Sequence, residues 1–149
     1  MLLLGTKNIG TQTVLADGLV NIGSVYRKFC KRNRCGVPAF SVTANGVTLN
    51  TEGIYHITAT FVGSGSVAGA LSVQLFLNGV AIDGAVSTET ITTADTEVRT
   101  WVVDYYAKVD NDCVLGITST DAQTVTFVNT SDGIDATFTS VVINIDKVV

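Results

Sequence analysis

Charged side chains are scarce in this sequence. Lys, Arg, Asp and Glu make up 15% of the 149 residues, against about 25% in an average soluble domain. No stretch approaches the roughly 20 consecutive apolar residues that span a bilayer, and Met1-Leu2-Leu3-Leu4 stops at Gly5 without a basic start or a long apolar run. We therefore expect no contact with a membrane, no secretion signal, and folding in the cytoplasm.

Histidine is rarer still, and this restricts the possible chemistry. The single histidine, His56, falls on the polar face of an expected strand, and spacing links no Ser or Cys to it. Nucleophilic catalysis needs a base within hydrogen-bond reach of the nucleophile and a third group that orients the base. We predict no enzyme, no catalytic residue and no cofactor, and we interpret His56 as an exposed or interface side chain.

Cysteine is sparse and odd in number, unlike the disulfide framework of a small secreted protein. Cys30 and Cys35 could bind zinc together with Cys113 and His56, since three thiolates and an imidazole satisfy a tetrahedral site. They could instead form a disulfide or remain free. Free thiols are the simplest interpretation, and Cys113 is expected in the core because Leu115 and Ile117 share its strand face.

Two turns are rich in Asp and Asn, whose side-chain oxygens are possible metal ligands. Residues 110–112 (Asp-Asn-Asp) and 132–135 (Asp-Gly-Ile-Asp) would suit a calcium ion, but Asx residues also favour turns through their own backbone hydrogen bonds. We favour turn formation and predict no bound metal. Residues 129–131 (Asn-Thr-Ser) match the N-glycosylation pattern, which we interpret as accidental.

β-branched residues are abundant, with twenty-one threonines and many valines and isoleucines against one methionine and one proline. Such side chains suit a pleated sheet. The chain fits one domain, and its apolar fraction of 46% suggests that some apolar surface is covered by another chain.

Strand patterns recur from residue 37 onward. Residues 54–62 alternate apolar and polar side chains, and a flexible Gly-Ser loop follows at 63–66. Residues 71–77 alternate equally well, and Asn78-Gly79 then predicts a tight hairpin turn because both residues tolerate positive φ. Three further strands are expected at 113–119, 124–129 and 136–145.

The segment 97–107 is apolar on both faces, which is typical of a sheet that is covered on both sides. With it, the chain has about nine or ten strands and no helical pattern. We predict an all-β jelly-roll sandwich of antiparallel strands over residues 37–149.

Residues 1–36 differ from the rest and are predicted to form an N-terminal arm or a pair of edge strands. They end in a basic run that holds five of the nine cations of the chain: Arg27, Lys28, Lys31, Arg32 and Arg34. Such a run can be a solvated loop, or can meet an acidic protein surface or nucleic acid. Nucleic acid is disfavoured because only Tyr26 and Phe29 accompany the run and the rest of the chain is acidic.

Four strings resemble the jelly-roll heads of the complement and tumour necrosis factor superfamily: GVTLNTEGIYHITATFVGSG, LSVQLFLNGVAIDGA, WVVDYYAKVDND and FTSVVINIDKV. The Gly53-Ile54-Tyr55 step, the Asn78-Gly79 turn and Lys147 near the end match the places of such features in that family. One departure is Asn111-Asp112, where the family has Ala-Gly-Asp. The resemblance covers about residues 40–149.

The resemblance implies a homotrimer packed around an aromatic and aliphatic axis, for which Tyr55, Trp101, Val103 and Tyr105 are the candidate interface residues. The sequence also resembles short proteins of bacterial viruses. This resemblance implies a capsid decoration or head-fibre protein at the virion surface, folded in the host cytoplasm. The basic run would then dock on the major capsid protein.

The alternative is a receptor-binding or adhesive trimeric head, in which loops at 63–70 and 83–96 would touch a host glycan or protein.

Overall fold

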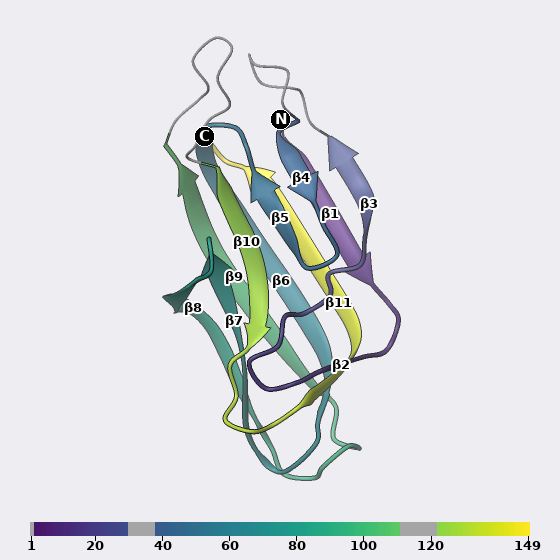
Figure 1. Cartoon of the computed structure of the whole chain (residues 1–149). Coiled ribbons are helices and arrows are strands. Elements are labelled where there is room, and N and C mark those ends of the chain that lie inside the picture. The colour runs from purple at the N-terminus through teal and green to yellow at the C-terminus, as the bar shows by residue number, and fades with distance from the viewer. Residues whose placement is uncertain (1, 30–37, 111–121) are drawn as a thin grey trace.

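Two antiparallel sheets pack face to face in the computed structural model, which describes residues 2–29, 38–110 and 122–149 (Figure 1). All eleven elements of these residues are strands. The first sheet has the order β3-β1-β11-β6-β9, with β2 also paired to β11. Its bounds are β1 Leu3–Asn8, β2 Gln12–Val14, β3 Ser24–Phe29, β6 Gly53–Gly65, β9 Arg99–Val109 and β11 Ala136–Lys147.

The second sheet has the order β4-β5-β10-β7-β8. Its bounds are β4 Phe40–Val42, β5 Gly46–Leu49, β7 Gly69–Leu77, β8 Val80–Ile91 and β10 Gln123–Asn129. The all-β jelly-roll prediction is confirmed, and the described residues hold slightly more strands than the nine or ten expected. The predicted strand at 113–119 lies outside the described residues.

Period-two patterning places the core between the sheets, as expected for β6. Tyr55, Ile57, Ala59 and Phe61 are fully buried, and the residues between them are half-buried on the outer face. The Asn78-Gly79 hairpin is also confirmed: the two residues have φ of 50° and 77° and join β7 to β8.

Aromatic rings fill the centre of the sandwich. Phe61 lies 5.4 Å from Phe127 of the opposite sheet and 5.5 Å from Phe138 of β11, measured between ring centroids. Trp101 meets Phe138 edge-on at 5.7 Å, and its Nε1–H donates to the carbonyl of Leu71 at 2.9 Å. This indole bond ties the first sheet to the second, so the two layers are joined by both packing and a buried hydrogen bond.

The N-terminal segment is part of the sandwich. β1 lies between β3 and β11, pairing Leu3 with Asp146 and Asn8 with Val141. Val20 and Ile22 are fully buried. Residues 2–29 therefore do not project as a free arm. Of the predicted pair of edge strands, β3 does lie at the edge of the sheet, whereas β1 lies between β3 and β11.

Asn129 anchors this segment from inside. Its buried side-chain amide donates to the carbonyls of Val14 and Ile134 at 3.1 and 2.8 Å, and its Oδ1 accepts from the backbone N–H of Ser131. A buried amide engaged in three hydrogen bonds is not accessible to glycosylation, so the 129–131 pattern is accidental.

Both predicted recognition loops are shorter than expected. Strand β6 runs through Gly65 and β8 through Ile91, so most of 63–70 and 83–96 is sheet. Gly63 is required for close approach: a Cβ there would lie 2.1 Å from the carbonyl oxygen of Thr137. The expectation of a flexible Gly-Ser loop is wrong at Gly63, Ser64 and Gly65 because these residues pair with β11.

The two ends of the chain meet at one end of the sandwich (Figure 1). The backbone N–H of Lys147 donates to the carbonyl of Leu2 at 2.9 Å.

Candidate functional site

The outer face of β9 carries three exposed apolar side chains. Val98, directly before the strand, is 67% exposed, Val102 is 52% exposed and Tyr106 is 57% exposed. They alternate with Thr100 and Asp104 along the same face, since every second residue of a strand points the same way. We name Val98, Val102 and Tyr106 the β9 outer face.

The predicted interface residues lie on the opposite side of the same strands. Tyr55 and Trp101 are 0% exposed and Val103 is 1% exposed within the single chain, and Tyr105 is half-buried and packed against the core. The assignment of Tyr55, Trp101 and Val103 to a trimer interface is therefore wrong, because these side chains fill the space between the chain's own two sheets.

The second sheet has an outer face of a different kind. Its hydroxyls pair with one another across neighbouring strands: Thr48 with Thr124 at 3.0 Å and Ser72 with Thr88 at 2.7 Å. These cross-strand pairs leave a face that water can solvate well. The exposed valines of the second sheet, Val80 and Val86, lie instead on its edge strand β8.

His56 stands beside the β9 outer face. Its ring stacks on Tyr106 with centroids 4.6 Å apart and planes 12° from parallel. Its Nε2 lies 2.8 Å from Asp104 Oδ1, and its Nδ1 lies 3.9 Å from Asp146 Oδ1. Three neighbouring strands, β11, β6 and β9, thus place an imidazole between two carboxylates on the sheet surface.

This cluster lacks the geometry of a catalytic triad. Thr58 Oγ1 is 3.4 Å from His56, but from the same Nε2 atom that Asp104 contacts. A general base must hold its orienting carboxylate on one ring nitrogen and its nucleophile on the other, but the carboxylate nearest Nδ1, that of Asp146, lies 3.9 Å away, beyond hydrogen-bond distance. The arrangement suits an interface histidine, one of the two interpretations made from the sequence.

The described part of the basic run is exposed on β3. Arg27 and Lys28 lie on this edge strand, none of whose six residues is buried. Beside them, the Tyr26 hydroxyl hydrogen-bonds to Asn144 Oδ1 at 2.7 Å, and Lys7 Nζ lies 5.4 Å from the centroid of the Tyr26 ring. The remaining candidates, Lys31, Arg32 and Arg34, lie outside the described residues.

The predicted ligand sites are only partly covered by the structure. Cys30, Cys35 and Cys113 lie outside the described residues, as do positions 111–112. In residues 2–29, 38–110 and 122–149, no group of three or more His, Cys, Asp or Glu side chains is placed to hold a metal ion. Nor do these residues form a helix long and apolar enough to cross a membrane.

The acidic turn at 132–135 serves the backbone. Asp135 Oδ1 accepts from the N–H of Ala16 at 3.1 Å, and the N–H of Asp135 donates to Ser66 Oγ at 3.0 Å. Gly133 has φ of 70°, a left-handed turn conformation. Asp135 therefore ties three segments of the chain together.

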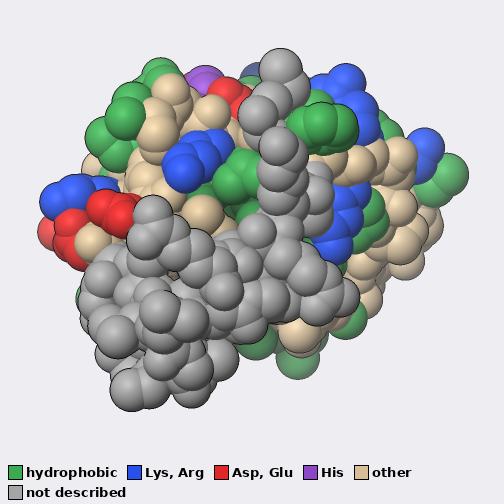
Figure 2. Space-filling model, turned by 90° about the horizontal axis from the view of Figure 1, so that it is seen from above, with side chains coloured by type: hydrophobic (Ala, Val, Ile, Leu, Met, Phe, Trp, Pro, Cys, Tyr) green, Lys and Arg blue, Asp and Glu red, His purple; other side chains and the backbone are tan. Residues whose placement is uncertain are grey.

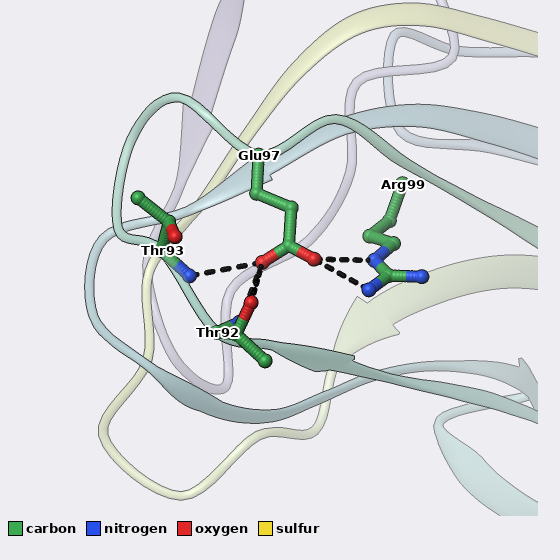
Figure 3. A network of polar contacts seen from close by, with 4 residues as sticks. All are labelled: Thr92, Thr93, Glu97 and Arg99. Carbon is green, nitrogen blue, oxygen red and sulfur yellow. Dashed lines mark hydrogen bonds and ion pairs between the residues drawn. The ribbon is translucent and has the colours of Figure 1, made fainter.

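Glu97 was missed by the sequence reasoning and organises the loop between β8 and β9 (Figure 3). Its Oε2 accepts from the backbone N–H of Thr93 at 2.9 Å and from the Thr92 hydroxyl at 2.9 Å. The same oxygen also accepts from the backbone N–H of Thr92. Its Oε1 accepts from Arg99 Nε at 2.9 Å. The two backbone donors, then the hydroxyl and Arg99, lower the pKa of Glu97 to about 2.

This carboxylate is structural because both of its oxygens accept hydrogen bonds from residues of the loop and of the adjoining first residue of β9. The signal that could have found it is a carboxylate four residues after a pair of threonines, in a segment with turn composition. The loop holds Val98 at the start of the β9 outer face.

A shallow hollow of ≈ 270 Å³ lies at the end of the sandwich, lined in part by Gly53, Ile54, Lys108 and Val149. Lys108 forms an ion pair with Asp110 there, and that pair raises the pKa of Lys108.

No protein-family model matches the chain, and no curated protein sequence matches it. Solved structures do match in fold. The globular domain of a zebrafish complement 1qA protein aligns over 100% of this chain and 98% of its own, with a TM-score of 0.63 at 10% identity. The Eiger TNF of S. frugiperda aligns over 99% and 91%, with a TM-score of 0.62 at 12% identity.

A third structure, PRD1 vertex protein P5, aligns over 99% of this chain and 97% of its own, with a TM-score of 0.54 at 16% identity. The resemblance drawn from the sequence motifs is thus confirmed at the level of fold. This chain has the jelly-roll fold of the complement 1q and tumour necrosis factor heads, which PRD1 vertex protein P5 shares.

Proposed function

We propose that the chain is a structural protein of a virus particle that assembles as a homotrimer and decorates the capsid surface. The observation that carries the proposal is the β9 outer face, which exposes two valines and a tyrosine above a core that is already complete. Isolated exposed apolar residues are ordinary, but a row of them on one strand marks an interaction surface.

Self-association suits this surface because β9 is an edge strand of its sheet. A second copy can approach both the edge and the outer face without disturbing the sandwich. Homo-oligomers close by symmetry, so each copy would present the β9 outer face to a neighbour around the ring. Tyr106 is the central residue of the contact, since tyrosine is enriched at the best-packed points of interfaces.

Attachment to the capsid is assigned to the β3 side. Arg27 and Lys28 lie at the opposite edge of the first sheet from β9. One edge can therefore serve assembly while the other serves docking. The fold shared with PRD1 vertex protein P5 supports a place on a particle by analogy.

Mass in solution tests the assembly. At micromolar concentration we expect three chains of 15.6 kDa, about 47 kDa together. The double variant Val102→Ser, Tyr106→Ser should lower the mass to that of one chain, while the control Val86→Ser, on the exposed edge of the second sheet, should leave it unchanged. A wild-type protein of 15.6 kDa under these conditions would contradict the trimer.

Negative-stain images of particles that carry the protein test decoration. Regular knobs over the shell are expected. Label confined to a fibre tip would instead favour the receptor-binding alternative.

A further inference from the structure

Strand β3 is an edge strand that is exposed on both faces. Each of its six residues, Ser24–Phe29, is exposed, whereas β9 at the other edge of the same sheet buries every second side chain over much of its length. In the described residues β3 pairs only with β1. Among the described residues, one row of its backbone N–H and C=O groups therefore has no strand partner.

The side chains of β3 combine cations with large apolar groups. Val25 is 39% exposed, Tyr26 is 43% exposed and Phe29 is 54% exposed. Arg27 and Lys28 separate the two aromatic residues in sequence, and neither forms an ion pair within the described residues. Lys108 on β9, by contrast, is already paired with Asp110.

Figure 2 shows this side of the molecule from above. Lys and Arg side chains, interleaved with hydrophobic ones, gather on the right, where β3 lies in Figure 1. The neighbouring strand β1 carries no Asp or Glu and adds Lys7. This edge therefore presents positive charge on a chain whose net charge is −4.

The edge is held in place before any partner arrives. The Tyr26 ring lies across Gly5 so closely that a Cβ there would be 2.8 Å from it. Its hydroxyl is bonded to Asn144, two strands away. The register of β3 against β1 shifts between Gly5 and Thr6, which marks a bulge at this point. A preformed edge loses little conformational entropy on binding.

We propose that β3 accepts an extended acidic segment of a partner protein as an additional antiparallel or parallel strand of the first sheet. Backbone hydrogen bonds would supply the pairing, while Arg27 and Lys28 would select carboxylates and Phe29 would pack on the segment. The inference rests on the proposed capsid attachment, for which it names the kind of contact.

A second copy of the chain fits this edge poorly. Pairing β3 with another β3 would bring Arg27 and Lys28 of both copies together, and like charges opposite one another destabilise a sheet. Cations on an edge are a common protection against such pairing. The same cations favour a segment rich in Asp and Glu, and this complementarity commits the edge to an acidic partner.

The experiment uses the full chain and a synthetic ten-residue peptide in which pairs of Asp alternate with pairs of Val, so that an added strand carries carboxylates on both faces. Binding is followed by fluorescence anisotropy and by hydrogen exchange at the amides of residues 24–29. We expect saturable binding that weakens with salt, and slower exchange confined to this strand. The double variant Arg27→Glu, Lys28→Glu should weaken binding about tenfold, because it replaces two attractive exposed charge pairs by repulsive ones. The control Lys108→Glu should bind as the wild type.

A second peptide of the same sequence, N-methylated at every residue so that neither edge can donate backbone hydrogen bonds, separates strand addition from simple charge attraction. It should not bind. Equal binding of both peptides, or binding of single-stranded DNA in place of the acidic peptide, would overturn the proposal. If the protein decorates particles but does not bind the peptide, strand addition is wrong and the proposed function still holds. If it binds the peptide but does not decorate particles, the proposed function is wrong and strand addition still holds.

Discussion

Replacing Trp101 by phenylalanine distinguishes a core residue from an interface residue. The indole is fully buried and its N–H donates to the Leu71 carbonyl of the opposite sheet. The variant loses this hydrogen bond, with a net cost of about 1 kcal/mol. The missing part of the indole leaves a small void against Phe138, which adds about 1–2 kcal/mol. The free energy of unfolding should fall by about 2–3 kcal/mol in all.

Urea denaturation at a fixed chain concentration measures this loss. Small proteins have m-values of about 1–3 kcal/mol/M, so the urea midpoint should move down by about 1 M or more. The exposed Val80→Thr on β8 serves as the matched comparison, since Val80 is 65% exposed. It should change the unfolding free energy by less than about 0.5 kcal/mol. A Trp101→Phe protein that keeps its stability but loses self-association would refute the burial argument and return Trp101 to the interface.

Two further outcomes test the loop and the sheet contact. The folded-state pKa of Glu97 lies near 2, below its ordinary value of 4.5, so its contribution to stability is complete above about pH 5 and is lost as the pH falls toward 2. The Glu97→Gln variant should therefore unfold more easily than wild type at pH 7, but as easily as wild type at pH 2. Denaturation curves of the two proteins that coincide at both pH values would contradict this. In thermal unfolding, Gly63→Ala should destabilise the protein several times more than Gly79→Ala. A Cβ at Gly63 would collide with a backbone oxygen, whereas a Cβ at Gly79 would meet nothing within 4 Å and would cost only the strain of a positive φ. Similar losses in both would disprove the close-approach argument.

The strands with one apolar face could be predicted because alternation determines both their type and their orientation. In β6 the buried set is the apolar set, so Tyr55 through Phe61 were correctly seen as one face. The hairpin at Asn78-Gly79 was equally predictable, since its turn depends on local φ alone.

Strand β9 could not be oriented from the sequence, because both of its faces are apolar. Alternation separates Trp101 and Val103 from Val102 and Tyr106, but it does not say which pair faces inward. The answer depends on the opposite sheet, where the Leu71 carbonyl accepts the indole N–H. The interface assignment therefore failed by one residue in register, which exchanges the two faces completely.

Long-range contacts explain the other differences. Gly63 lies in a segment with the composition of a flexible loop. The backbone of Thr137 on β11, far along the chain, approaches it so closely that no Cβ fits there. Likewise, Val20 and Ile22 lie in short apolar pieces whose burial depends on strands formed much later in the sequence. The proposed docking residues Arg27 and Lys28 were identified by charge, while their position on the edge strand β3 required the structure.

The hydrogen bond between Lys147 and Leu2 has a practical consequence for protein engineering. Since the chain enters and leaves at one pole, a peptide or fluorescent protein fused to either terminus emerges there, and the pole with the Glu97 loop stays unobstructed. A short linker between the adjacent termini would also allow new ends to be opened elsewhere, such as at the exposed Asn78-Gly79 turn.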